Sequence, residues 1–70
     1  MLSRMRLVRI QREFTQLDVS AKTGIPQWRI SLIERGIKPT SEEAEKIAGA
    51  LNTDIKKLFP KLEAKQHAAL

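Results

Sequence analysis

The sequence predicts an all-α fold, a compact bundle of five short helices. Apolar residues recur at helical spacing in each segment, and Gly, Pro or Asn residues separate the segments. No stretch alternates apolar and polar residues as a half-buried strand would. The 70 residues are enough for one domain. We expect this domain at residues 1–60, followed by a tail at 61–70 that is either partly helical or frayed.

The first helix is expected at residues 3–12, with Ser3 as its N-cap. Leu2, Met5 and Val8 recur at helical spacing along this first segment. Leu7 and Ile10 form a second apolar line, which either covers Phe14 or meets another subunit.

The second and third helices are expected to form a helix-turn-helix. Thr15 is a strong N-cap and Asp18 completes a capping box, so the second helix begins at Gln16. Gly24 suits the left-handed end of that helix, and the third helix runs from Gln27 to Glu34. Four apolar residues are expected to face inward where the helices cross: Val19, Ile25, Ile30 and Ile33. The third helix then turns four side chains outward, on a face that suits a DNA major groove: Gln27, Trp28, Arg29 and Leu32.

The positive charge lies in the same half of the chain. The net charge is +5; residues 1–38 hold eight basic and three acidic residues, whereas residues 39–70 hold five of each. This distribution suits a module that neutralises phosphates, although a solvated basic face would have the same composition.

The fourth helix is expected from Ser41 to about Leu51, because Thr40 and Glu43 spell a second capping box and Asn52 suits a left-handed end. Its buried face should carry Ala44, Ile47, Ala48 and Leu51. Thr53 or Asp54 should cap a brief fifth helix, which contains Ile55, Leu58 and Phe59 and which Pro60 ends or kinks.

Composition excludes several classes of protein. Without cysteine there are no disulfides or thiolate metal sites, and His67 alone cannot form an imidazole site. No catalytic constellation is apparent, so we expect neither an enzyme nor a cofactor or metal. No apolar run approaches the ~20 residues that span a bilayer, and no signal peptide is present, so we expect a soluble, cytoplasmic protein without a membrane partner.

A more specific pattern covers the helix-turn-helix. The pattern opens with the pair Thr15-Gln16. The pair Gly24-Ile25 begins eight positions after Gln16, and the run I-S-x-I-E-R-G extends from Ile30 to Gly36. Matching residues on either side are Arg9, Pro39, Thr40, Lys46, Ile47, Ala48, Ala50, Leu51, Leu58 and Phe59. Over about residues 5 to 59 the chain thus resembles the Cro/repressor-type, or xenobiotic-response-element, family of helix-turn-helix proteins, which implies a lambda-repressor-like DNA-binding domain.

This resemblance implies contacts with double-stranded DNA. The usual base-facing positions hold Gln27, Trp28, Arg29 and Leu32. Gln27 would pair with adenine, Arg29 with guanine, and Leu32 would touch a thymine methyl group. Phosphate contacts are implied for Thr15, Gln16, Arg35 and Lys38, although helix capping alone also explains the first two.

The resemblance also implies an internal ion pair between Arg9 and Glu34. Two positions depart from the family pattern: Pro26 replaces a serine or threonine cap, and Trp28 is bulky where a small or polar residue is common. Trp28 either packs against sugar or thymine or is partly buried in its own domain. A chain of this size buries only roughly 60% of its unfolded surface, which favours a homodimer. Its candidate seam is Ile55, Leu58 and Phe59, residues that also suit the core.

The leading prediction is a transcriptional regulator of bacterial or phage type, a dimeric repressor that reads a near-palindromic operator through residues 27–34. RNA polymerase is a further candidate partner. The alternative is an antitoxin or adaptor of the same fold whose main partner is another protein, such as a toxin.

Overall fold

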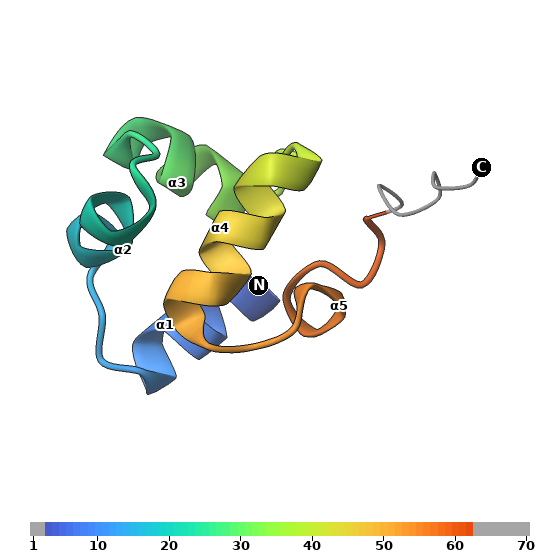
Figure 1. Ribbon diagram of the computed structural model, residues 1–70, viewed down its shortest axis with the longest axis horizontal. Helices are drawn as coiled ribbons and strands as arrows, with labels where there is room; N and C mark the ends of the chain where they lie inside the picture. Colours follow the sequence, from blue (N-terminus) through green and yellow to red (C-terminus); the bar gives the residue numbers. More distant parts are fainter. Residues whose placement is uncertain (1–2, 63–70) are drawn as a thin grey trace.

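The computed structural model describes residues 3–62, whose arrangement is shown in Figure 1. Five helices follow one another: α1 (Arg4–Gln11), α2 (Gln16–Thr23), α3 (Gln27–Glu34), α4 (Ser41–Leu51) and α5 (Ile55–Leu58). No strand occurs among these residues. The predicted all-α fold with five short helices is confirmed. The expectations for Leu2, His67 and the tail from residue 63 onward lie outside the described residues.

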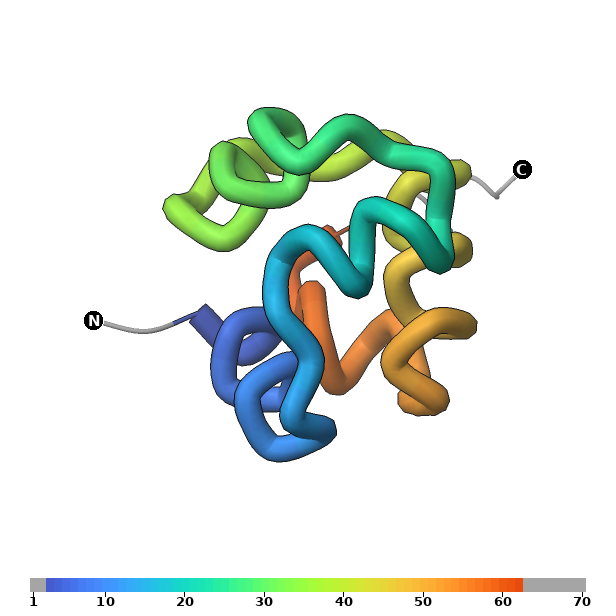
Figure 2. Tube along the Cα trace, turned by 90° about the vertical axis from the view of Figure 1, so that its left-hand side faces the viewer, coloured from blue at the N-terminus to red at the C-terminus, as the bar shows by residue number. Residues whose placement is uncertain are grey.

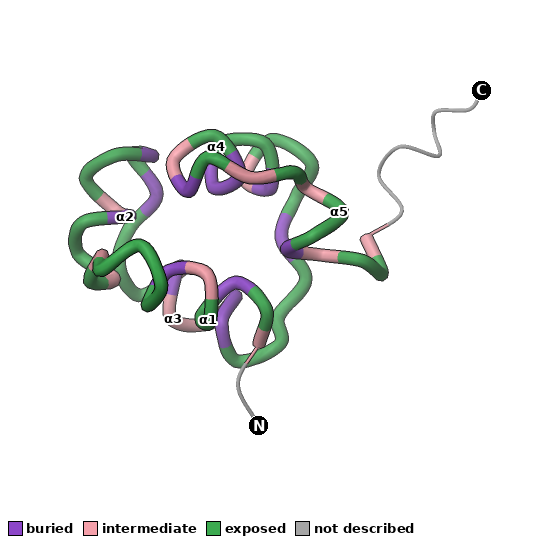
Figure 3. The backbone as a smooth tube through the Cα atoms, turned by 90° about the horizontal axis from the view of Figure 1, so that it is seen from below, coloured by how far each residue is buried: buried purple, intermediate pink, exposed green. Residues whose placement is uncertain are grey.

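The helices enclose an apolar core. α2 packs against α3 and α4, while α5 packs against α1 and α4. Buried residues of α4 face those of α1 and α3 across the molecule (Figure 3). The largest fully buried side chains among the described residues are Met5, Val19, Ile30, Ile47 and Leu51. The predicted inward positions of the helix-turn-helix and of α4 are all buried, which confirms the spacing argument.

Capping fixes where the helices begin and end. In α2 the Thr15 hydroxyl accepts a hydrogen bond from the Asp18 N–H (3.0 Å), and the Asp18 carboxylate accepts one from the Thr15 N–H (2.8 Å). Thr40 and Glu43 repeat this capping box at the start of α4, as predicted. Asn52 ends α4 in the left-handed region with φ of 56°. Residue 54 occupies the N-cap of α5 but forms no side-chain capping bond.

A buried ion pair ties α1 to the end of α3. The Arg9 guanidinium donates from Nε and Nη2 to the two carboxylate oxygens of Glu34, and from Nη1 to the Phe14 carbonyl (2.9 Å). The Arg9 and Glu34 side chains are only 10% and 3% exposed. Figure 2 shows α3 (green) at one edge of the molecule and α1 (blue) at the other, with the start of α2 between them. The geometry agrees with the implied pair and fixes α3 relative to the rest of the domain.

Candidate nucleic-acid interface

The turn before α3 sets the angle at which this helix leaves the domain. Gly24 ends α2 with φ of 80°, a left-handed conformation that favours glycine. The Ser20 hydroxyl donates to the Ile25 carbonyl (2.6 Å), and the Ile25 N–H donates to the Thr23 hydroxyl (3.1 Å). α3 begins after Pro26 without a side-chain cap, as the sequence suggested. Its first backbone N–H groups therefore have no side-chain acceptor at the cap.

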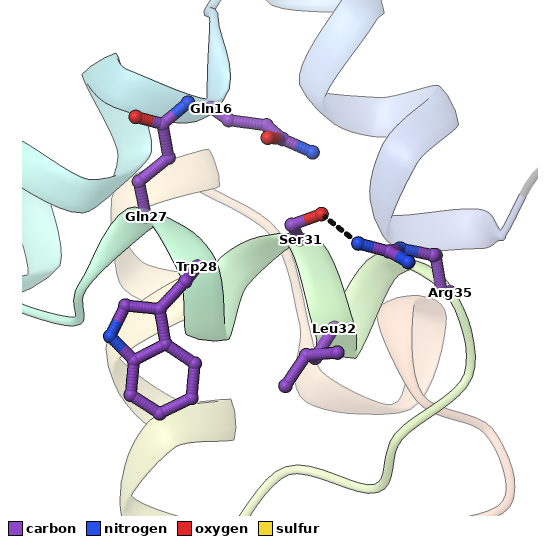
Figure 4. Close-up of a pocket in the computed structure, with 6 residues that line it drawn as sticks. All are labelled: Gln16, Gln27, Trp28, Ser31, Leu32 and Arg35. Atoms are coloured by element: carbon purple, nitrogen blue, oxygen red, sulfur yellow. Dashed lines mark hydrogen bonds between the residues drawn. The ribbon is translucent and has the colours of Figure 1, made fainter.

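The outward side of α3 forms a shallow hollow of about 530 Å³, shown in Figure 4. We call its lining the α3 face; it consists of Gln16, Gln27, Trp28, Ser31, Leu32 and Arg35. Three of the four predicted base-facing residues and two of the four predicted phosphate contacts thus lie together. Their assignment to bases or phosphates remains a prediction.

The α3 face has a polar edge and an apolar edge. On one side of the helix, Gln27, Ser31 and Arg35 lie toward Gln16 of α2, and Arg35 donates to the Ser31 hydroxyl (3.0 Å). On the other side, Trp28 and Leu32 lie four residues apart, one helical turn, and point away from α2. The Trp28 side chain is largely in solvent, since the residue is 66% exposed. About a third of Trp28 is covered by its own domain, and the larger part of the residue is free for contact with another molecule.

Gln16 is connected to the buried ion pair. Its amide nitrogen donates to Glu34 Oε1 (3.1 Å), the same oxygen that accepts from Arg9 Nη2. An amide nitrogen carries two N–H donors, so one remains for another acceptor. The ion pair therefore orients Gln16 at the rim of the α3 face.

Arg29 is the residue whose placement differs most from the expectation. Its Nε and Nη2 donate to the two carboxylate oxygens of Glu43 on α4, both at 2.9 Å. The Arg29 and Glu43 side chains are 23% and 20% exposed, and Arg29 does not line the α3 face. Hydrogen bonds from Arg29 hold the pKa of Glu43 below its ordinary value, and those to Glu43 raise the pKa of Arg29. Arg29 thus lies against α4 instead of pointing outward with its neighbours on α3, because this carboxylate is in reach.

The remaining predicted phosphate contacts lie outside the α3 face. Thr15 is exposed, and its hydroxyl accepts in the capping box while keeping its own hydrogen as a donor. Lys38 is exposed in the loop after α3 and lines a second groove of about 600 Å³, between this loop and α5. Thr15 and Lys38 are therefore exposed, but neither of them lines the α3 face.

The candidate dimer seam is only partly available. Leu58 is 3% exposed and belongs to the core, whereas Ile55 and Phe59 are half-buried and pack against it. The large apolar residues that are exposed are Leu7, Ile10, Leu17, Trp28 and Ile37. Of these, Ile37 lines the second groove together with Leu58 and Phe59.

The sequence analysis missed two residues of this region. Ser31 lies on the α3 face four residues after Gln27 and four before Arg35, so helical spacing alone would have identified it. Glu43 was assigned to capping only. Its contact with Arg29 joins residues 14 positions apart on different helices, and no local pattern signals such a pair.

Residues 3–62 contain neither a membrane-spanning helix nor a cluster of metal ligands. No helix among residues 3–62 has the length and apolar character needed to cross a membrane. In the same part of the chain, no three His, Cys, Asp or Glu side chains gather as metal ligands.

Comparison with known proteins places this geometry in a family. Curated proteins and solved structures gave no match to the chain. A family model described as helix-turn-helix matches residues 5–58, which include α1 from its second residue, the whole of α2 to α5 and every residue of the α3 face. The chain therefore belongs to the Cro/C1-type, xenobiotic-response-element-like helix-turn-helix family of DNA-binding domains.

Proposed function

We propose that this protein is a sequence-specific regulator of transcription that binds double-stranded DNA as a dimeric repressor. The observation that carries the proposal is the α3 face, where Gln27, Trp28 and Leu32 are exposed or half-exposed. The helix that carries them is held to α1 by the buried Arg9–Glu34 ion pair. A protruding helix of this kind fits a major groove, whose edges differ for each base pair.

Phosphate contacts would position the α3 face over the bases. The second amide N–H of Gln16, the Thr15 hydroxyl and the backbone N–H groups that open α2 suit one phosphate, and Arg35 and Lys38 suit others. The concentration of positive charge in residues 1–38 supports this orientation. DNA affinity should therefore fall steeply with salt, with log K decreasing by ~0.9 per neutralised phosphate for each tenfold rise in salt.

The dimer and the repression are the finer parts of the proposal. Two copies would place their α3 helices ~34 Å apart, in successive major grooves of a near-palindromic operator. Ile55 and Phe59 are partly exposed, and they are the seam residues available for such a contact. Binding would repress by covering a promoter, in a bacterial or phage-infected cytoplasm. We propose no catalytic activity for this domain.

Selection from randomised duplex DNA tests the proposal. The purified protein should enrich a two-fold symmetric motif at about physiological salt, and the Gln27→Ala variant should lose or relax it. Gln11→Ala provides a matched control, because Gln11 is an exposed glutamine on α1, away from the α3 face. Absence of any motif with a folded protein would contradict the proposal, and so would an unchanged motif in Gln27→Ala.

The second candidate function is an antitoxin or adaptor whose main partner is a protein. Exposed Leu7 and Ile10 on α1 and Leu17 on α2 favour it, since each exposes close to half of its surface or more. Binding through these apolar side chains should change little with salt, unlike binding to phosphates. Alanine at Leu7 and Ile10 would then weaken capture of the protein partner and leave DNA selection unchanged.

A further inference from the structure

The ion pair between Arg29 and Glu43 decides which charges the α3 face can offer. Arg29 is the only basic residue between Gln27 and Glu34, and both of its carboxylate contacts are with Glu43. To reach a base, Arg29 would have to give up this bidentate contact. Glu43 is itself held in place, because its Oε1 also accepts the Thr40 N–H (2.9 Å) in the capping box of α4.

With Arg29 held against α4, the residues of the α3 face that lie within α3 are uncharged. Gln27 and Ser31 are polar, whereas Trp28 and Leu32 form the apolar edge. The charged member, Arg35, follows the last helical residue and donates to Ser31. Guanine is read most often by Arg or Lys, which donate to its O6 and N7. The α3 face has no such group at its centre.

The groups that remain suit A·T base pairs. A glutamine amide both donates and accepts, which matches N6 and N7 of adenine. Thymine alone among the four bases presents a methyl group in the major groove, and an exposed indole and isobutyl group one turn apart can cover it. Burying that methyl also removes part of the exposed Trp28 surface from water.

We propose that Glu43 is a specificity-determining residue: by holding Arg29 against α4, it leaves an α3 face that selects A·T pairs, with Gln27 on adenine and the Trp28–Leu32 edge on thymine methyl groups. This inference rests on the proposed function, and it names the class of operator that the α3 face recognises. Glu43 acts through Arg29 and does not itself touch DNA.

The first experiment uses the duplex that the wild-type protein enriches. Each thymine of the half-site is replaced in turn by deoxyuridine, which removes the methyl group and keeps the base pairing. At the positions opposite Trp28 and Leu32, affinity should fall about fourfold for each methyl removed. In the Leu32→Ala variant the same replacement should have less effect, whereas Ile10→Ala, an exposed residue of α1, should keep the full effect.

The second experiment releases Arg29. Glu43→Gln keeps an acceptor for the capping box but removes the charge that holds the guanidinium. Glu42→Gln is the matched control, because the adjacent Glu42 is largely exposed and its ion pair is with Lys46 (3.4 Å) and not with Arg29. The measurement is the affinity for the enriched duplex relative to one with G·C in place of an A·T pair. Glu43→Gln should shift this ratio toward G·C by about fivefold or more, and Glu42→Gln should not.

These arms separate the outcomes. The proposal is overturned if deoxyuridine changes nothing at any position, if Glu43→Gln and Glu42→Gln give the same ratio, or if the wild-type motif contains a guanine that Arg29→Ala no longer selects. Failure of every variant and of the wild-type protein to enrich a motif would instead overturn the proposed function. If Glu43→Gln does not fold, the thymine replacements still test the A·T preference of the α3 face. The comparison of the wild-type and Arg29→Ala motifs then tests whether Arg29 is held away from the bases.

Discussion

Replacement of Arg9 by methionine should strongly destabilise the domain. In the native protein the Arg9 guanidinium makes two hydrogen bonds with Glu34 and one with the Phe14 carbonyl. Methionine keeps the volume of the aliphatic stem but strands the Glu34 carboxylate, whose side chain is 3% exposed, with Gln16 as its remaining side-chain donor. Removing one partner of a well-buried pair costs ~3–5 kcal/mol.

That loss is large compared with the stability of a small domain. At ~0.05–0.15 kcal/mol per residue, 70 residues give ~4–10 kcal/mol in total. A loss of ~3 kcal/mol should lower Tm by ~12–24 °C, since 1 kcal/mol corresponds to ~4–8 °C at this size. Urea unfolding followed by circular dichroism measures the change directly, with Arg6→Met, an exposed arginine of the same helix, as the control.

A double variant distinguishes a stranded charge from lost packing. In Arg9→Met with Glu34→Leu no buried charge remains, so this protein should be more stable than Arg9→Met alone. Wild-type stability in Arg9→Met would refute the assignment of a buried, structural ion pair. A double variant no more stable than the single one would refute the reason given for the loss.

Three further predictions concern stability. Gly24→Ala should destabilise the domain by ~1 kcal/mol because φ is 80° there. Gly49→Ala in α4 should stabilise it by ~0.5–1 kcal/mol, because nothing outside its own helix backbone and chain neighbours lies within 4 Å of the added methyl group. Thermal melting measures the sign of both changes. Thr40→Ala should cost ~1 kcal/mol by loss of the α4 cap, measured by urea unfolding, and Thr53→Ala, a half-exposed threonine that caps no helix, serves as comparison. The pKa of Glu43 is lowered on folding, so its contribution is full above the ordinary glutamate pKa of about 4.3 and is lost as pH falls through the folded value. Glu43→Gln should therefore lose less stability than wild type between about pH 6 and about pH 3, and equal losses would contradict this linkage.

Much of the fold follows from local patterns in the sequence. The capping boxes at Thr15 and Thr40, the left-handed ends at Gly24 and Asn52, and the 3.6-residue spacing of apolar side chains act within a few residues of one another. Such signals identify where helices begin, end and turn inward without knowledge of the rest of the chain. They do not decide whether a candidate N-cap side chain forms its hydrogen bond. For example, α5 was predicted with a side-chain cap and forms without one.

The outward side of α3 shows the limit of this reasoning. Helical spacing assigned Gln27, Trp28, Arg29 and Leu32 outward, and three of them line the α3 face. Arg29 does not, because its long side chain reaches whichever carboxylate the packed domain brings near. That carboxylate belongs to Glu43, which the sequence had explained completely as a helix cap.

The positions of the helices, the capping boxes of α2 and α4 and the inward residues could be predicted from the sequence alone, because they depend on contacts between near neighbours in the chain. Tertiary structure decided the partners of the long polar side chains: Gln16 with Glu34, and Arg29 with Glu43. These partners depend on the length of the side chains. An arginine or glutamine side chain can meet any group within several ångströms of its helix, and only the packing of α3 against the rest of the domain settles which group is there.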